Sequence, residues 1–556
     1  MREIMINTDI LREKPYSLSE EQRKKVADQI DQMSLQDKVG QLFFLPYYGQ
    51  FMSDESVLQM VKNIQPGGMM LRPTPQVKAT EIIDLIKANS RIAPFISANL
   101  ENGANGLIEG GVSYGSLMQL SAANDPQLVN LAASDIGKQS YALGANMAFA
   151  PVVDLNYHCL NPITGTRAFG EEAGHVKEMA ANFAKGFMDH GILPVIKHFP
   201  GDGVDDRDHH VLASVNSLSF KEWEESYGAV YKELIDQGMP CVMAGHILLP
   251  AYERMVQPGI KDQKLLPATL STHLLNGLLR ERLGFNGLII TDASGMCGFN
   301  SFATRQETVV HSINAGCDML LFTMDLEEDY SAVLQAVMRG VISNERLNEA
   351  LVRILGMKES INSKQVAETE LPPSTQLVDQ VFDQSITLVK DNDGTLPIHA
   401  EAYPRILLIP LGNEDKSGDI LARELEMKGF QVTLYDTGRM DLSLIFGKVA
   451  DLKAKYDLVI YACDYQVKSN QTSNRIEWGM PAGQYMPWFV KDLPVIMISF
   501  GNPYHLYDAP RIPTYINAYS NNARNIELVV QKLVGESEFK GVSPVDAFCG
   551  RFDTRC

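Results

Sequence analysis

The sequence predicts an α/β protein in which an N-terminal (β/α)8 TIM barrel precedes a smaller α/β sandwich. Three observations predict this fold class. Eight short apolar runs recur in the first 360 residues, helical segments separate them, and a polar break precedes a second series of apolar runs. The 556 residues are too many for one hydrophobic core. We predict a barrel domain over 1–360, a linker over 361–380 and a sandwich domain over 381–556.

The eight apolar runs of the first domain are continuous rather than alternating, which is typical of parallel strands buried on both faces. Eight β/α alternations are what a closed barrel requires, although periodicity alone leaves a doubly wound open sheet as the competing architecture. The runs are 39–47, 67–71, 93–102, 145–156, 191–201, 238–246, 287–294 and 316–322.

The segments between these runs carry helix signals. Residues 124–144 start with Asn124 or Asp125 as the N-cap and Pro126 in the first turn. Residues 220–238 and 271–284 end in glycine, a frequent C-cap.

The second domain follows a polar segment with two adjacent prolines, which is typical of a linker. The alternation of strands and helices then restarts. We expect a helix at 418–429 and strands at 405–412, 430–436, 456–463 and 494–501.

Composition excludes several classes of partner. The formal net charge of −19 argues against nucleic acid, because phosphate binding needs a basic surface. No apolar run is long enough to span a membrane, and residues 1–25 lack the apolar core of a signal peptide. Seven cysteines without a CxxC pair suit reduced thiols, so we expect a cytoplasmic protein. Homodimerisation is left open.

Polar side chains follow the apolar runs at the C-terminal strand ends, where the active sites of barrels lie. Such groups are costly unless they are solvated, paired or used. They are Asn99, Glu101, Asp154, Arg167, Lys197, His198, His246 and Asp292.

Asp292 directly follows the apolar run "GLIIT". A carboxylate at a strand end can act as a nucleophile, but aspartate also commonly caps the helix that follows a barrel strand. The sequence alone leaves both interpretations open.

The segment "KHFPGDGVDDRDHH" (197–210) is rich in aspartate and histidine. Asp208 and His210 are two residues apart, so in an extended loop both side chains lie on one side. Aspartate can then orient the imidazole and leave its other nitrogen for proton transfer. A solvated polar loop is the alternative. No ordered metal-ligand spacing occurs, so we predict no metal and no cofactor.

Several ordered motifs together resemble glycoside hydrolase family 3, in its β-N-acetylhexosaminidase branch. They include the segment 197–210, "FAPVVDLNYHCLNPITGTRAFG", "VMAGHILLPAY", "GLIITDASGM" and "INAGCDMLL". The resemblance covers most of residues 20–360, and "SITLVKDNDGTLPI" resembles the start of the family's second domain.

The resemblance implies roles for nine residues. Asp292 matches the nucleophile, His210 the general acid/base and Asp208 its orienting partner. Substrate-binding roles fall on Lys197, His198, Arg167, Asn99, His246 and Met296.

Three departures from the branch pattern concern Asn99, Asp202 and His209. Asn99 replaces an aspartate, Asp202 replaces the histidine of G-H-G, and His209 replaces a small hydroxyl residue. We interpret Asp202, Asp205, Asp206 and His209 as loop residues without a task, and His209 as a solvated neighbour of the acid/base.

The leading hypothesis is a retaining β-N-acetylglucosaminidase that acts on small oligosaccharides. A phosphorylase of the same branch and a β-glucosidase are the enzymatic alternatives, and a non-catalytic sugar-binding protein is the last. In the second domain, Arg475, Glu477 and Trp478 could close over a sugar, but a loop that packs on the barrel is the favoured interpretation.

Overall fold

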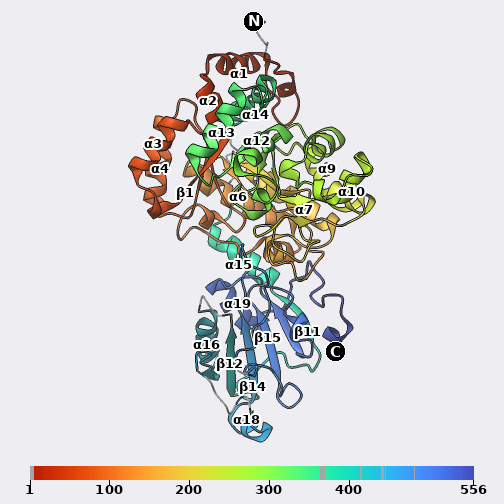
Figure 1. Cartoon of the computed structure of the whole chain (residues 1–556). Helices are drawn as coiled ribbons and strands as arrows, with labels where there is room; N and C mark the ends of the chain where they lie inside the picture. Colours follow the sequence, from red (N-terminus) through yellow and green to blue (C-terminus); the bar gives the residue numbers. More distant parts are fainter. Residues whose placement is uncertain (1–5, 363–369, 413–415, 440–443, 445, 481) are drawn as a thin grey trace. The chain divides into compact units, whose positions relative to one another are not determined.

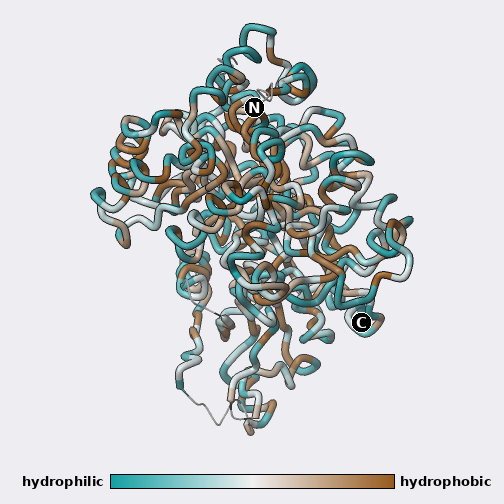
Figure 2. Tube along the Cα trace, turned by 45° about the horizontal axis from the view of Figure 1, so that its top comes forward, coloured by the Kyte–Doolittle hydropathy of each residue, from teal (hydrophilic) through white to brown (hydrophobic). Residues whose placement is uncertain are grey.

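The computed structural model describes residues 6–362, 370–412, 416–439, 444, 446–480 and 482–556. The chain forms two compact units (Figure 1). The first contains Met1–Ser113, Asn130–Leu155 and Ala173–Leu371, and the second contains Tyr114–Val129, Asn156–Glu172 and Pro372–Cys556. Along the chain, hydrophobic stretches alternate with hydrophilic turns (Figure 2), as a series of buried elements joined by surface loops requires.

The first unit is a barrel of eight parallel strands, and all eight predicted runs contain one of them. Their order in the sheet is β10-β1-β2-β3-β4-β5-β7-β9. The sheet closes because Thr291 N of β9 donates to Met319 O at 3.0 Å, next to a parallel bridge between Ile290 and Met319. The strands are β1 (Phe43–Tyr47), β2 (Gly68–Leu71), β3 (Phe95–Ala98), β4 (Met147–Ala148), β5 (Leu193–Phe199), β7 (Cys241–Ala244), β9 (Leu288–Thr291) and β10 (Leu320–Leu321).

Helices alternate with these strands, and their ends follow capping rules. The Asp125 carboxylate accepts from the backbone N–H groups of Gln127 and Leu128, so it caps α6 as predicted. Residues 273–282 form a π-helix, a local deviation that periodicity does not reveal. The main helices are α1 (Glu20–Gln32), α2 (Leu35–Gly40), α3 (Asp54–Ile64), α4 (Gln76–Asn89), α6 (Pro126–Ala142), α7 (Ala173–Asp189), α9 (Ala229–Asp236), α12 (Arg305–Ala315), α13 (Leu326–Met338) and α14 (Asn344–Asn362).

The second unit is built on a six-stranded sheet with the order β11-β16-β15-β14-β12-β13. Its four predicted strands are β12 (Arg405–Leu411), β13 (Gln431–Leu434), β14 (Leu458–Cys463) and β15 (Val495–Ser499). Two further strands, β11 (Thr387–Asp391) and β16 (Thr514–Asn517), were not predicted, and they pair with each other in antiparallel orientation. Its helices include α15 (Ser374–Ser385), α16 (Ser417–Met427), α18 (Val449–Lys455) and α19 (Ala523–Leu533).

The second unit contains more of the chain than the predicted domain 381–556. Helix α5 (Leu117–Ala122), from the first half of the chain, is buried along its whole length and packs against α15. The Gln119 side chain donates to Ser385 and Asn525 there. The predicted linker 361–380 includes the end of α14 and the start of α15, and its residues 363–369 lie outside the described residues.

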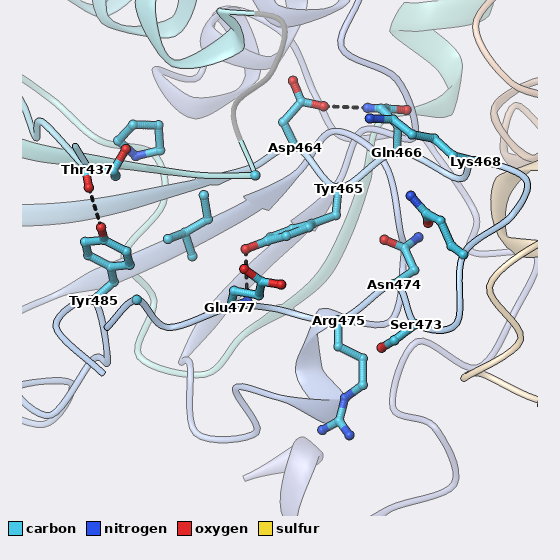
Figure 3. A pocket seen from close by; sticks show the side chains of 15 residues that line it. Thr437, Asp464, Tyr465, Gln466, Lys468, Ser473, Asn474, Arg475, Glu477 and Tyr485 are labelled. Atoms are coloured by element: carbon cyan, nitrogen blue, oxygen red, sulfur yellow. Dashed lines mark hydrogen bonds between the residues drawn. The ribbon is translucent and has the colours of Figure 1, made fainter. Parts of the chain in front are cut away.

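A cavity of about 530 Å³ opens in the second unit at the C-terminal ends of β12 and β14 (Figure 3). The sheet order reverses between these two strands, which is where open α/β sheets form crevices. Glu477 N donates to the Tyr465 hydroxyl in this cavity at 3.0 Å. Trp478 instead packs edge-on against Tyr461 of β14 and against the core of the second unit, with the two ring centroids 6.2 Å apart.

Lys358 of α14 is a buried ammonium in the barrel unit. Its Nζ donates to Gln41 Oε1 at 2.7 Å and lies 5.2 Å from the Phe95 ring centroid. Burial lowers the pKa of Lys358 from 10.5 to about 7. Below pH 7 the folded protein therefore buries a charged ammonium group, which lowers the free energy of unfolding. This destabilisation decreases as the pH rises from 7 toward 10.5, because the unfolded chain then binds more protons than the folded one.

We expect Lys358→Met to raise the free energy of unfolding by about 2 kcal/mol at pH 6 and by less at pH 9. Urea unfolding at the two pH values measures this difference. Lys221→Met, at a side chain that is 81% exposed, is the control and should change little. An equal gain from Lys358→Met at both pH values would show that Lys358 does not titrate as described.

Among the described residues, no helix is both long enough and apolar enough to cross a membrane. All seven cysteines are free thiols.

Candidate active site

The C-terminal ends of five barrel strands bring polar side chains to one buried cluster around Asp292. The cluster comprises Glu101 after β3, Asp154 after β4, Lys197 and His198 on β5, His246 after β7 and Asp292 after β9. Six of the eight predicted polar strand-end residues therefore meet, as the geometry of a parallel barrel requires.

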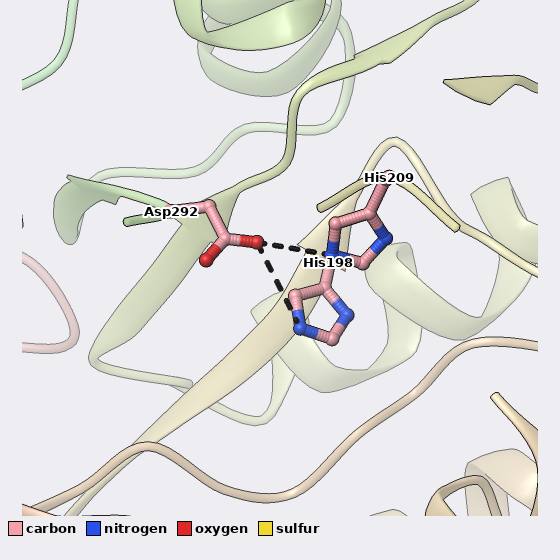
Figure 4. Close-up of side chains that lie close together, drawn as sticks. All are labelled: His198, His209 and Asp292. Carbon is pink, nitrogen blue, oxygen red and sulfur yellow. Dashed lines mark ion pairs between the residues drawn. The ribbon is translucent and has the colours of Figure 1, made fainter. Parts of the chain in front are cut away.

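Asp292 is fixed by the backbone on both sides. Its N–H donates to Ala244 O at 2.8 Å, and its Oδ1 accepts from Ala293 N at 2.7 Å. The next helix, α11 (Cys297–Asn300), starts only after Met296, which is its N-cap residue. The helix-cap interpretation of Asp292 is therefore wrong, and the second carboxylate oxygen, Oδ2, faces two histidines (Figure 4).

Lys197 and His198 each bind a carboxylate of the cluster. Lys197 Nζ lies 2.6 Å from Glu101 Oε1, and His198 Nδ1 lies 2.7 Å from Asp154 Oδ2. His198 Nε2 is then directed toward Asp292 Oδ2, at 4.0 Å. Burial lowers the pKa of His198, and Asp154 only partly opposes this effect. His198 is thus oriented as a neutral imidazole beside the Asp292 carboxylate.

The predicted pair of Asp208 and His210 is present. Asp208 Oδ1 lies 2.7 Å from His210 Nδ1 and also accepts from His210 N at 2.8 Å. Burial alone would raise the pKa of Asp208, but the hydrogen bonds from His210 lower it, so Asp208 is a carboxylate. The His210 side chain is 20% exposed, and its contact with Asp208 is made by Nδ1 rather than by Nε2.

Asp202 and His209 are not solvated loop residues, and this part of the sequence interpretation is wrong. Asp202 is 2% exposed and His209 is fully buried. His209 Nδ1 binds Asp202 Oδ2 at short distance, and His209 Nε2 lies 3.3 Å from Asp292 Oδ2. His209 therefore bridges two carboxylates inside the cluster (Figure 4).

The loop adopts this packed course because glycine and aromatic residues shape it. Gly201 has a φ of +120°, and a Cβ atom there would lie 2.1 Å from the Tyr227 ring. The Tyr227 hydroxyl donates to Asp202 O, and Trp223 Nε1 donates to Pro200 O at 2.8 Å. Gly201 thus allows a close approach of the backbone to the Tyr227 ring.

The charge of the cluster keeps Asp292 ionised. Burial would raise the pKa of Asp292, but the close contact with the positively charged His209 ring holds it well below its usual range. Burial would likewise lower the pKa of His209, but Asp202 and Asp292 raise it to about 10. Asp292 is therefore a carboxylate and His209 an imidazolium at neutral pH.

His246 has both ring nitrogens engaged within the protein. Nδ1 lies 2.9 Å from Thr269 Oγ1 and Nε2 lies 3.1 Å from Ala293 O. Burial lowers its pKa to about 4, so the ring is neutral. We interpret His246 as a support for the backbone carbonyl of Ala293, the residue after Asp292, rather than as a sugar ligand.

The remaining predicted ligands lie in different settings. Asn99 follows β3 and is exposed, and Met296 is 7% exposed. Arg167 is partly buried in a turn, Gly165–Arg167, that belongs to the second unit.

His198, His209 and Asp292 also have the donor types of a metal site, and their ligand atoms lie within 4.8 Å of one another. A metal ion would need a neutral His209, because histidine binds metals as imidazole. The raised pKa of His209 and its position between two carboxylates favour the imidazolium instead. We assign no metal to this group.

Sequence reasoning missed the partnership of Asp202 and His209, although a signal was present. Both positions depart from the pattern of the resembled branch, and the structure shows that the two departing side chains contact each other. Paired departures within one short loop therefore indicate a contact that single positions do not.

Comparisons with known proteins agree with this geometry. Residues 34–357 match the model of the glycosyl hydrolase family 3 N terminal domain. The chain is 40% identical to a β-N-acetylglucosaminidase/β-glucosidase of Cellulomonas fimi, over 97% of this chain and 98% of that protein. It is 29% identical to β-hexosaminidase A of Pseudoalteromonas piscicida, over 63% and 64% of the two chains.

Solved structures also resemble this chain over nearly its full length. A β-glucoside phosphorylase, BglX, bound to 2FGlc superposes with a TM-score of 0.91 at 37% identity, covering 98% of this chain and 99% of that chain. A family 3 β-N-acetylglucosaminidase from Paenibacillus sp. gives a TM-score of 0.78 at 25% identity, covering 93% and 100%. The protein described here therefore belongs to glycosyl hydrolase family 3 and is a glycosidase.

Proposed function

We propose that the chain cleaves terminal β-linked N-acetylglucosamine or glucose residues with retention of the anomeric configuration. One observation carries this proposal. An ionised Asp292 lies at the mouth of the barrel, and a separate Asp208–His210 pair lies on the neighbouring loop. Retention requires both devices, a nucleophile for the anomeric carbon and a proton donor for the leaving oxygen.

In the first step, an Asp292 oxygen forms a bond to the anomeric carbon while the glycosidic bond breaks. His210 donates its Nε2 proton to the leaving oxygen, and Asp208 stabilises the imidazolium before transfer. In the second step, neutral His210 removes a proton from the acceptor, whose oxygen displaces Asp292 from the anomeric carbon. The two displacements together retain the configuration.

Phosphate is a second candidate for the acceptor in place of water. The acid/base at this site is an imidazole, which carries no negative charge when it is neutral, so it repels a phosphate dianion less than a carboxylate would. The likeness to a β-glucoside phosphorylase supports this reading. Both sugars remain in the proposal because the relative from Cellulomonas fimi is named for both.

A substrate panel with and without phosphate tests the proposal. We expect 4-nitrophenyl β-N-acetylglucosaminide and β-glucoside both to be cleaved, with a β-configured first product seen by NMR. If phosphate is the acceptor, it should raise the rate and give a sugar 1-phosphate. If phosphate leaves the rate unchanged and free sugar is the only product, water is the acceptor and the reaction is hydrolysis. An α-configured first product would contradict the retaining mechanism.

A further inference from the structure

His209 occupies a position that the two-step mechanism does not yet use. The ring is fully buried between Asp202 and Asp292, with Nδ1 on the first carboxylate and Nε2 3.3 Å from the second. Neither Nε2 nor Asp292 Oδ2 has a well-aligned hydrogen-bond partner among the described side chains, so the contact is mainly one of charge. A ring with a carboxylate at each nitrogen needs a proton on both.

The histidine is held in this position by its surroundings. Asp202 N donates to Asp154 Oδ1 at 2.8 Å, and the Tyr227 hydroxyl donates to Asp202 O, so the partner carboxylate is itself fixed. The His209 ring stacks on that of His210, with centroids 4.7 Å apart and an angle of 17°. Rotation of the His209 ring away from Asp292 would break these contacts, so the cation is built into the site.

We propose that His209, held by Asp202, is a positioning residue that stabilises the free carboxylate of Asp292 and thereby speeds the second step of the reaction. This inference rests on the proposed function. In the free enzyme, Asp292 is an anion beside a cation. In the glycosyl-enzyme, the same carboxyl group is a neutral ester, and the attraction to His209 is lost.

The charge of His209 therefore acts in opposite directions on the two steps. It makes the Asp292 carboxylate a weaker nucleophile in the first step. It makes the same group a better leaving group in the second, when the acceptor oxygen bonds to the anomeric carbon and the electron pair of the breaking bond returns to Asp292. The glycosyl-enzyme consequently does not accumulate.

His209→Asn tests the inference with an activated 2,4-dinitrophenyl glycoside, for which the first step is fast. We expect kcat to fall about tenfold or more and KM to fall with it, so that kcat/KM changes little. Intact-protein mass spectrometry should show the covalent sugar adduct accumulating during turnover. Equal losses in kcat and kcat/KM without an adduct, or no change at all, would overturn the proposal.

Further variants keep the test decisive. Asp202→Asn removes the charge that supports the imidazolium and should give a smaller shift in the same direction, and it replaces His209→Asn if that variant does not fold. His505→Gln alters another fully buried histidine, in the second unit, and should leave kcat and KM each unchanged, with no accumulating adduct. If a 2-deoxy-2-fluoro glycoside labels wild type but not Asp292→Ala, the proposed function stands independently of the His209 result.

Discussion

Replacing Asp292 by alanine is expected to lower turnover of an aryl β-glycoside by about 10⁴-fold or more. The carboxylate is held ionised at the centre of the cluster, and no other described carboxylate shares its position next to His198 and His209. Azide should partly restore turnover by filling the space of the lost carboxylate, and it should give an α-glycosyl azide because only one displacement then occurs. Steady-state rates and product NMR measure both effects.

Asp206→Ala is the matched control for this prediction, because Asp206 is an exposed aspartate of the neighbouring loop. It should retain the activity of the wild type. Circular dichroism would show whether Asp292→Ala keeps its fold. If a folded Asp292→Ala protein kept a turnover within tenfold of wild type, Asp292 would not be the nucleophile.

The barrel could be predicted because each of its strands can be recognised from a short stretch of sequence. A strand such as β9, buried at every position, is a continuous apolar run in the sequence, and eight such runs suffice to indicate the fold. Strand β16 carries the residues Thr-Tyr-Ile-Asn and is buried only because β15 and β11 pair with it on either side. Residues 514–517 therefore form a strand because of the neighbouring strands, and their own sequence pattern does not predict one.

The candidate site was predictable to the same extent. The polar ends of buried strands identify Lys197, His198 and Asp292, since a parallel barrel brings all strand ends to one face. The contact of Asp202 with His209 depends instead on how the loop turns at Gly201 against the Tyr227 ring. That turn is set by tertiary packing, which explains why composition suggested a solvated loop.

The proposed acid/base role of His210 predicts an effect that depends on the leaving group. For a substrate with a poor leaving group, such as an alkyl glycoside, His210→Ala should lower kcat/KM by about 10²–10⁴-fold, because the leaving oxygen needs a proton. For a 2,4-dinitrophenyl glycoside, whose leaving group departs as a stable anion, kcat/KM should change little. Comparing the two substrates on one variant separates proton donation from damage to the fold.

A histidine–carboxylate pair of the barrel unit that lies outside the cluster supplies the control for His210. His273 Nδ1 lies 2.7 Å from Glu253 Oε2, the same separation as between His210 Nδ1 and Asp208 Oδ1. His273 is the first residue of the π-helix His273–Arg282 and does not belong to the cluster around Asp292. His273→Ala should leave both substrates unaffected. Asp208→Asn should follow the leaving-group pattern of His210→Ala with a smaller loss, because the amide still orients the ring without stabilising its charge. If His210→Ala impaired both substrates equally, His210 would hold the sugar rather than transfer a proton.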